Sequence, residues 1–465
     1  MIRAAILGLT GALVLSGCVG QRTPGERAAR RELSQIDESY RPQGRKPDLP
    51  EIKTNSPLNE FLLYAVLNQP QVEAAYYDWA AAVQRITVER SLPDPRLTFS
   101  ADIADVVMSL MAGLMIDLPG PGKLRAAANV AAAESQVSYF EFHQAVLQAA
   151  YNLKRAYYQL YFLNQRIAIN RETLSLLGDL ERIARAQNEA AKVTLQDVLR
   201  AQIEKERLGT EIENLEDSRS PLVAQFKAAL GLKPQEANPP IPAAFESSTI
   251  QTSPDELLTV ALARNPRLRR MEAEIRQADA AIRVARRGRV PDFNLGLDVD
   301  VKASPFMFSP QAGITLPIWR DKIAAQIAAA QARRRAAEAR LSGEEIAVAV
   351  EFAERSFALR ESERNLRLLE ESLVPKAKNS LQVARSGYTS GRANFIDWID
   401  AERTLLEFQL AEVQARTERE LALAELSLLI VGEAPAGVPL LTNTNGKKRS
   451  ERRIEDAPAK NKDRR

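Results

Sequence analysis

Residues 290–301 read Val-Pro-Asp-Phe-Asn-Leu-Gly-Leu-Asp-Val-Asp-Val, and over 293–301 every second side chain is apolar. Strict alternation of this kind predicts a β-strand with one apolar and one polar face. Residues 312–316 alternate in the same way and predict a second strand close behind. The polar face of the first strand is expected to contact water, because it carries charged side chains: Asp298, Asp300 and Lys302.

A strand that crosses a bilayer at a tilt needs about 9–11 residues, and these strands approach that length. A hairpin half-buried in a soluble domain would alternate in the same way. Two features favour the membrane: an export signal at the N-terminus, and no later apolar run long enough for a transmembrane helix. We therefore expect lipid on the apolar face of the strands and a water-filled lumen on the polar face.

The strands belong to a unit that occurs twice. Segment 58–231 aligns with segment 257–432, and alternation recurs in the first copy at 97–103 and 110–118. Short matches mark the repeat: Leu92-Pro93-Asp94 with Val290-Pro291-Asp292, and Leu118-Pro119 with Leu316-Pro317. Such a long period predicts a duplicated half-domain rather than a solenoid. Pro119 and Pro317 are expected to mark the two turns from strand to helix.

The repeat and its flanks predict six parts of the chain. They are a signal peptide (1–17), a lipidated N-terminal segment (18–57), the first repeat (58–232), a proline-rich linker (233–253), the second repeat (254–433) and a disordered charged tail (434–465).

Helical patterns fill the rest of each repeat. The helices are expected at 58–91, 122–187 and 195–230 in the first repeat, and at 254–288, 320–386 and 395–431 in the second. The second helix of each set would extend roughly 100 Å at 1.5 Å per residue. Apolar side chains at spacings of three and four form seams along the returning helices. Helices this long are expected to pack side by side as antiparallel coiled coils.

Four strands per chain cannot close a barrel, and hydrocarbon does not tolerate open strand edges. Two chains would give eight strands and a lumen filled by side chains, whereas three give twelve strands and a wet passage. The sequence thus predicts a mostly α-helical chain with a small membrane β part. Three copies would form a homotrimer in which a 12-stranded β-barrel tops an α-barrel of coiled-coil helices.

The N-terminus has the pattern of an export and anchoring signal. Arg3 precedes an apolar segment, 4–14, that is too short to span a bilayer. Leu15-Ser16-Gly17-Cys18 resembles the bacterial lipobox, in which the cysteine becomes the acylated, palmitate-bearing first residue of the mature protein. Val19 follows rather than aspartate, so we expect anchoring in lipid of the outer membrane, with the helices in the periplasm. A plain signal peptide that ends in cysteine is the alternative.

The composition argues against an enzyme. Cys18 is the one cysteine and His143 the one histidine, which excludes a disulfide framework and a Cys/His metal cluster. We expect His143 to be an ordinary helix residue. No phosphate loop, zinc motif or nucleophile elbow occurs, so no catalytic residue, metal or cofactor is expected. The 63 basic and 60 acidic residues nearly balance, which gives no reason to expect nucleic acid as a partner.

One further motif lies between the last two predicted helices, where Tyr388-Thr389-Ser390-Gly391 precedes Asp397-Trp398-Ile399-Asp400-Ala401. It resembles the Y-x-x-G…D-V-L-D-A signature of the TolC family of outer-membrane efflux proteins. Leu316-Pro317-Ile318 resembles that family's strand-to-helix step, and the resemblance covers nearly all of 58–432. It implies the channel of a tripartite efflux system, a passive trimeric duct served by an inner-membrane pump and a periplasmic adaptor.

In that family the same helical turn lies at the periplasmic tip, where the helices close the duct. The resemblance assigns Asp397 and Asp400 to rings of carboxylates at the constriction. It also places Asp197 in the lock of the closed tip, with Tyr388 as its partner. The family's usual arginine of this lock falls at Ala393 here. The alternative is that both ring aspartates form a solvated helix face near an N-terminus.

Two other classes of protein are less consistent with the sequence. A periplasmic coiled-coil adaptor normally has one helical hairpin, and the duplication argues against it. A structural lipoprotein without a channel would not need two-faced strands. The exported substrate stays open among drugs, metal ions and proteins. Methionines near the strand ends would suit soft-metal export, although apolar packing in the membrane explains them better: Met108, Met111, Met115 and Met307.

Overall fold

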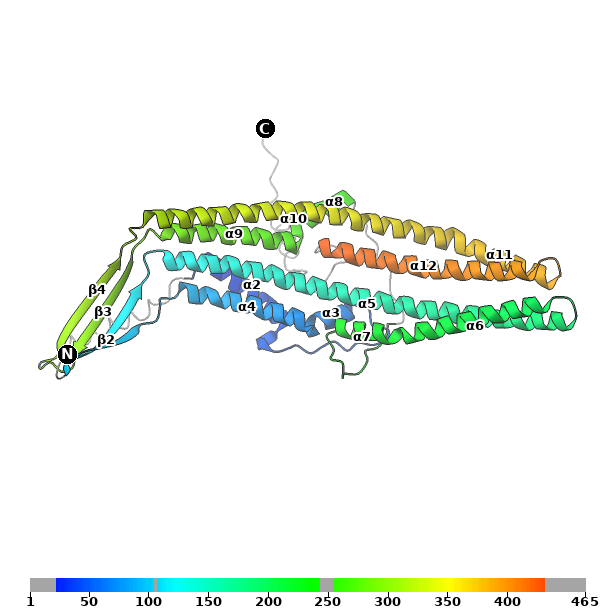
Figure 1. Cartoon of the computed structure of the whole chain (residues 1–465), viewed down its shortest axis with the longest axis horizontal. Coiled ribbons are helices and arrows are strands. Elements are labelled where there is room, and N and C mark those ends of the chain that lie inside the picture. The colour runs from blue at the N-terminus through cyan, green and yellow to red at the C-terminus, as the bar shows by residue number, and fades with distance from the viewer. Residues whose placement is uncertain (1–21, 104–106, 243–253, 431–465) are drawn as a thin grey trace, which may run out of the picture. The chain divides into compact units, whose positions relative to one another are not determined.

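The computed structural model describes residues 22–103, 107–242 and 254–430 (Figure 1). The predicted signal peptide, Cys18 and the charged tail 434–465 lie outside these residues. The chain forms two compact units, each of which draws on both predicted repeats. The sheet unit comprises residues up to 45, 74–144 and 266–346, and the helical unit comprises 46–73, 145–265 and the residues from 347 on.

The elements follow the same order in the two halves of the chain: a pair of helices, a pair of strands, a long helix and a returning helix. The first half contains α2 (Pro24–Tyr40), the short turn η1 (Pro42–Gly44), α3 (Leu58–Asn68), α4 (Pro70–Arg90), β1 (Arg96–Ile103), β2 (Val107–Leu118), α5 (Lys123–Glu189), α6 (Leu195–Asp217) and α7 (Arg219–Ala229). The second half contains α8 (Pro254–Arg264), α9 (Pro266–Arg287), β3 (Asp292–Asp300), β4 (Met307–Thr315), α10 (Arg320–Leu368), the π-helical turn η2 (Leu369–Leu373), α11 (Val374–Thr389) and α12 (Phe395–Leu429).

Prolines break helices that we predicted to be continuous. The predicted helix 58–91 is two helices, because Pro70 cannot donate a helical hydrogen bond and forces Gln69 into an extended conformation (ψ 119°). Pro266 separates α8 from α9 in the same way. In the predicted helix 320–386, the π-helical turn η2 stands just before Pro375, where the proline ring crowds the carbonyl one turn earlier.

The four strands form one antiparallel sheet in the order β1-β2-β3-β4 within the described chain, which confirms the predicted strand pairs. The register places like side chains opposite each other, for example Leu97 opposite Leu114, which lies opposite Leu297. We call the resulting surface the apolar sheet face; its large side chains are 40–70% exposed in the single chain. It consists of Leu97, Phe99, Leu110, Leu114, Phe293, Leu295, Leu297, Phe308 and Ile314.

The opposite face of the sheet is polar. Asp298 lies opposite Gly113, where a Cβ atom would come within 1.7 Å of the Asp298 carboxylate, so a larger residue there would force the Asp298 side chain to move. Asp300 lies between Met111 and Met307 in one row across three strands. These two methionines are therefore on the face that carries the aspartates, and packing in an apolar membrane environment, our preferred explanation, does not fit them.

The core of the helices in the sheet unit is aromatic. The Trp79 ring of α4 stacks on Phe142 of α5 at 5.8 Å between ring centroids, and Tyr40 of α2 packs edge-on against Phe142. Helix α2 was not expected from the sequence. Its buried Glu26 forms an ion pair with Arg90 of α4 at 2.9 Å, so α2 is held by partners distant in the sequence.

The helical unit has cores of its own. Phe61 of α3 packs against Tyr157 of α5 and Phe226, with 5.8 Å between ring centroids in both pairs. A second cluster joins Leu257 of α8, Phe352 and Leu426 of α12. No described helix combines the length and the apolar composition needed to cross a bilayer.

Candidate functional site

Two tight turns in the helical unit link the long helices to the returning ones. Between α11 and α12 the backbone N–H of Arg392 donates to the Gly387 carbonyl at 2.7 Å, and Gly391 has a left-handed φ of 73°. Between α5 and α6 the N–H of Lys192 donates to the Gln187 carbonyl at 2.9 Å, and Ala191 has a φ of 54°. The two turns therefore close by the same pattern.

One hydrophobic cluster supports both turns. Tyr388 packs against Phe395 and Trp398, with ring centroids 5.7 and 5.3 Å apart. The cluster also includes residues of α5 and α6, the helices on either side of the other turn. Its other buried members are Leu177, Leu180, Ala184, Val198, Ala201, Leu208, Ile212 and Ile399. Because α5, α6, α11 and α12 all contribute, the turns are positioned against each other by apolar packing.

Asp397 and Asp400 both lie on the exposed side of the first turns of α12, while Trp398 and Ile399 between them are buried. The Asp397 carboxylate accepts a hydrogen bond of 3.0 Å from the backbone N–H of Asn394, as part of a capping box. Asp397 therefore has a local structural task in addition to any role in a gate. Asp400 lies one turn further along the same face.

Asp197 and Tyr388 are neighbours but are not hydrogen bonded. The Asp197 carboxylate lies 3.8 Å from the guanidinium of Arg200 in its own helix. The Tyr388 hydroxyl is buried and has no hydrogen-bond partner among the described residues. Burial, together with the negative charge of Asp197, raises the pKa of Tyr388 to about 12. Arg392 does not bridge the pair, because its Nε donates to Ser390 Oγ in the same turn at 3.2 Å.

A cavity of about 840 Å³ lies beside this cluster, between α5, α6 and α12. Glu402 lines it and is only 5% exposed, and burial raises the pKa of its carboxyl to about 7, with Arg385 opposing the shift and Glu172 adding to it. Asn170 also lines the cavity; it is 1% exposed, and both polar atoms of its amide lack a partner among the described residues. Sequence analysis did not select Glu402, although its place four residues after Trp398 puts it on the apolar side of α12.

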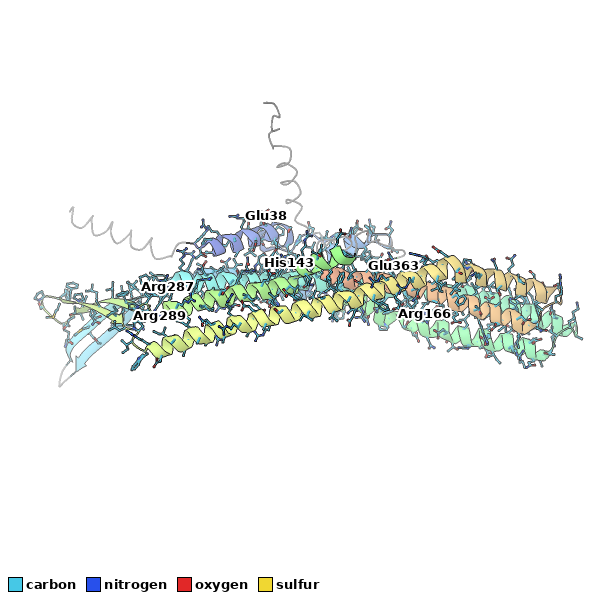
Figure 2. The ribbon with its side chains drawn as sticks, turned by 90° about the horizontal axis from the view of Figure 1, so that it is seen from above. Glu38, His143, Arg166, Arg287, Arg289 and Glu363 are labelled. Atoms are coloured by element: carbon cyan, nitrogen blue, oxygen red, sulfur yellow. The ribbon has the colours of Figure 1, made fainter. Side chains whose placement is uncertain are left out.

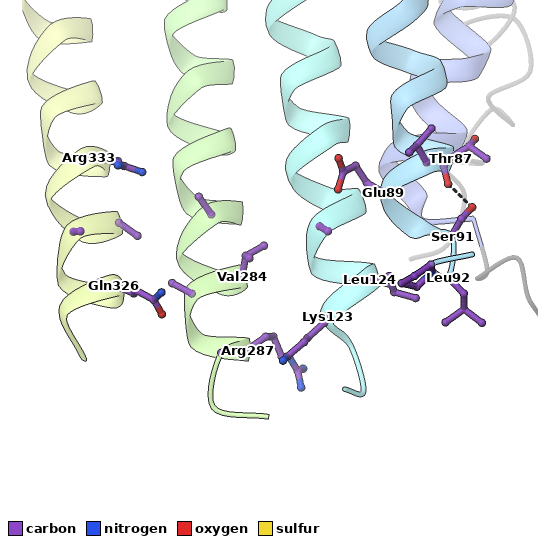
Figure 3. Close-up of a pocket in the computed structure, with 18 of the residues that line it drawn as sticks. Thr87, Glu89, Ser91, Leu92, Lys123, Leu124, Val284, Arg287, Gln326 and Arg333 are labelled. Atoms are coloured by element: carbon purple, nitrogen blue, oxygen red, sulfur yellow. Dashed lines mark hydrogen bonds between the residues drawn. The ribbon is translucent and has the colours of Figure 1, made fainter. Parts of the chain in front are cut away.

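Pro119 and Pro317 lie between strand and helix in the sheet unit. After Pro119, the N–H of Gly120 and the ammonium of Lys123 both donate to Asp292 Oδ1 at 2.7 Å, which ties the start of α5 to the start of β3. Arg287 lies beside them and donates to the Pro121 carbonyl at 3.3 Å (Figure 3). A second, open cavity of about 1040 Å³ lies here, lined by residues of α4, α5, α9 and α10.

His143 has no features of a catalytic base. Its ring lies 4.3 Å from that of Tyr139, and burial lowers the pKa of His143 to about 4. In the described parts of the chain, no three His, Cys, Asp or Glu side chains are grouped to hold a metal ion.

Residues 257–432 match the family described as outer membrane efflux protein. This confirms the resemblance predicted from the sequence. The family comprises components of channels and transport systems rather than enzymes.

Individual proteins are similar to this chain in sequence or in fold. CzcC, a cobalt-zinc-cadmium resistance protein of Cupriavidus metallidurans, is 26% identical over 157 residues, which are 33% of this chain and 37% of CzcC. The outer membrane protein VceC of Vibrio cholerae has a TM-score of 0.66 at 19% identity and covers 81% of this chain and 96% of its own. The open MtrE outer membrane channel of Neisseria gonorrhoeae has a TM-score of 0.69 at 18% identity, with coverages of 83% and 93%.

Proposed function

We propose that this chain is the outer-membrane channel of a tripartite efflux system, a passive trimeric duct that carries substrates from a periplasmic adaptor and an inner-membrane pump to the outside. The observation that carries the proposal is the apolar sheet face. Nine large apolar side chains on one surface stay exposed in the single chain, next to a polar face with Asp298 and Asp300. Lipid on one side and water on the other account for both faces.

The open edges of the sheet support the trimer. β1 and β4 each pair with one strand only, so their outer backbone groups need partners in hydrocarbon. Three chains that join β4 of one to β1 of the next would close twelve strands, and the coiled-coil helices would continue the cylinder. In this arrangement each of the two repeats supplies two strands, and acylated Cys18 anchors the chain in the outer membrane.

The gate proposal builds on the supported turns of the helical unit. In three copies, Asp397 would form one ring of three carboxylates and Asp400 a second. These rings would attract cations and repel anions. Asp197 and Tyr388 would act in the lock of the closed state. Tyr388 belongs to the hydrophobic cluster, and the negative charge of Asp197 acts on its hydroxyl without a hydrogen bond between them.

We propose divalent transition-metal cations as the cargo, on the basis of one relative and of the side chains on the polar face of the sheet. CzcC is named a cobalt-zinc-cadmium resistance protein. Here Asp300 lies in one row with Met111 and Met307 on the polar face of the sheet. Carboxylate and thioether side chains both interact with divalent transition metals, so these cations are the first cargo to test.

The test is the mass and the conductance of the full-length protein purified in detergent. We expect native mass spectrometry to show three times the mass of one mature, acylated subunit, and planar bilayers to show cation-preferring single channels. A monodisperse monomer, or a trimer that never conducts, would contradict the duct and favour a periplasmic adaptor or a structural lipoprotein.

A further inference from the structure

The turn from β4 to α10 exposes three large apolar side chains in succession. Leu316, Ile318 and Trp319 are 61%, 64% and 70% exposed. Two exposed basic residues, Arg320 and Lys322, follow in the first turn of α10, with the exposed Asp321 between them. We call Leu316, Ile318, Trp319, Arg320 and Lys322 the Trp319 patch.

The other two tryptophans show how unusual this exposure is within the chain. Trp79 is 1% exposed and Trp398 is 4% exposed, each inside an aromatic cluster. An indole ring and two aliphatic side chains left in water are unfavourable, because apolar area is costly to hydrate. Something outside the single chain is therefore expected to cover the Trp319 patch.

The corresponding turn of the first half is built differently. Its residues Pro119-Gly120-Pro121-Gly122 include no large apolar side chain, and Leu118, the counterpart of Leu316, is half-buried. Its backbone packs directly on the chain, since a Cβ atom at Gly120 would lie 2.2 Å from the Pro291 carbonyl oxygen. The exposed apolar turn is thus a property of the second half alone, and closure of the fold does not require it.

The patch is continuous with the apolar sheet face. Ile314 of β4 belongs to that face, and Leu316 lies two residues further, on the same side of an extended chain. Whatever covers the Trp319 patch must therefore also cover the end of the apolar sheet face that is nearest the helices. At this end the proposed membrane strands leave the bilayer.

Positive charge surrounds this end of the sheet unit. The last turn of α9 and the residues after it carry Arg286, Arg287 and Arg289, all exposed, and Figure 2 labels the last two where α9 approaches the sheet. α9 and α10 are neighbours, joined by an Arg334–Asp279 ion pair of 2.8 Å. Within the described chain, neither Arg320 nor Lys322 pairs with a carboxylate.

We propose that the Trp319 patch docks into the headgroup layer of the bilayer leaflet nearest the helices and fixes the depth at which the channel sits. The inference rests on the proposed membrane function. Indole rings favour the boundary between headgroups and acyl chains, where the ring is apolar and its N–H meets water. Arg320 and Lys322 lie beside it to contact lipid phosphates, as basic residues do at anionic leaflets. A neighbouring copy is a poorer occupant, because it would have to neutralise both cations.

The experiment measures the depth of Trp319 by quenching in vesicles of phosphatidylcholine and phosphatidylglycerol. A Trp79→Phe/Trp398→Phe variant leaves Trp319 as the one fluorophore, and lipids carry bromine either near the headgroup or near the chain end. We expect shallow bromine to quench roughly half of the emission and deep bromine to quench much less, as for an interfacial ring. If this variant does not fold, the difference between wild-type and Trp319→Phe emission gives the same signal.

A matched control uses an equally exposed position on the same helix. Ile346 is 68% exposed and lies 27 residues after Trp319, about 40 Å along α10 at 1.5 Å per residue. Ile346→Trp in a background without other tryptophans should show no bromine quenching. Arg320→Gln with Lys322→Gln should remove the dependence of Trp319 quenching on phosphatidylglycerol while the channel still conducts.

Conductance of the same vesicles separates the two proposals. Channels that conduct while Trp319 is not quenched, or while it is shielded from both lipid and acrylamide, would overturn the lipid docking and leave the duct intact. The second result would assign the patch to contact between copies. Vesicles that take up no protein would instead contradict the proposed function itself.

Discussion

Glu402 shows how one residue can make the helical unit sensitive to pH. Its carboxyl has a folded-state pKa of about 7 because it is buried, against an ordinary value of 4.5. The folded chain therefore holds the proton more tightly than the unfolded chain, so stability is greatest at low pH and falls as pH rises from about 4.5 to about 7. The charges that face Glu402 are Arg385 and Glu172, and the Glu204–Arg403 ion pair lines the same cavity.

Glu402→Gln should remove most of this pH dependence. The pKa difference corresponds to at most about 3 kcal/mol, so at pH 8 the variant should be more stable than the wild type, and at pH 4 the two should be alike. Denaturant midpoints at both pH values measure the effect. Glu418→Gln, an exposed carboxylate on the same helix that lies outside this cavity, is the control and should not change the profile. A wild-type midpoint that is the same at pH 5 and pH 8 would count against the assignment.

For single residues, the sequence allowed us to predict those that belong to a motif but not those whose role depends on packing between distant segments. Asp397 and Asp400 were predicted because their spacing resembles a family signature, and their role in a gate stays a prediction. Glu402 lies in the same segment, but its burial depends on α5 and α6, which are about 200 residues away in the chain. The capping role of Asp397 was readable as Asn394 followed three residues later by an acid.

The two helix-to-helix turns offer a test at the scale of elements. Ala191 and Gly391 occupy the same left-handed position, but only glycine adopts it without steric cost. Ala191→Gly should therefore stabilise the protein by roughly 0.5–1 kcal/mol, and Gly391→Ala should destabilise it by about 1 kcal/mol. Urea unfolding of both variants measures this. Ala186→Gly, inside α5, is the control and should destabilise by about 1 kcal/mol, since glycine is unfavourable within a helix. Equal effects of the two Ala→Gly changes would show that the Ala191 conformation is not strained.

Element types were more predictable than element ends. Alternation located β3 within one residue at each end, because its apolar residues share one face whatever lies beyond them. The breaks at Pro70 and Pro266 were missed because the helical pattern continues on both sides of each proline. Helix α2 was missed for a different reason: it is largely polar, and its ordering depends on contacts such as Tyr40 with Phe142 and Glu26 with Arg90.

At the scale of the whole molecule, the proposed trimer rests on the groups that one chain leaves without partners. The open edges of β1 and β4 and the exposed apolar sheet face were both foreseeable from alternation and strand number. The position of the aspartates was foreseeable only through the family signature, because ring formation requires three copies. The structure of a single chain therefore supports the proposed gate least directly, and a test of the gate needs a measurement on the assembled channel.

Ion selectivity gives that measurement. Asp397→Asn and Asp400→Asn each remove one ring of charge, and asparagine keeps an oxygen that can still accept the Asn394 N–H in the helix cap. We expect each variant to lower the preference for cations over anions, and the double variant to lower it further, because fewer carboxylates line the constriction. Reversal potentials in a salt gradient measure the preference, and circular dichroism and trimer mass should stay unchanged. Glu407→Asn on the same helix controls for a general loss of charge. A double variant with wild-type selectivity would show that these aspartates only cap and solvate the start of α12.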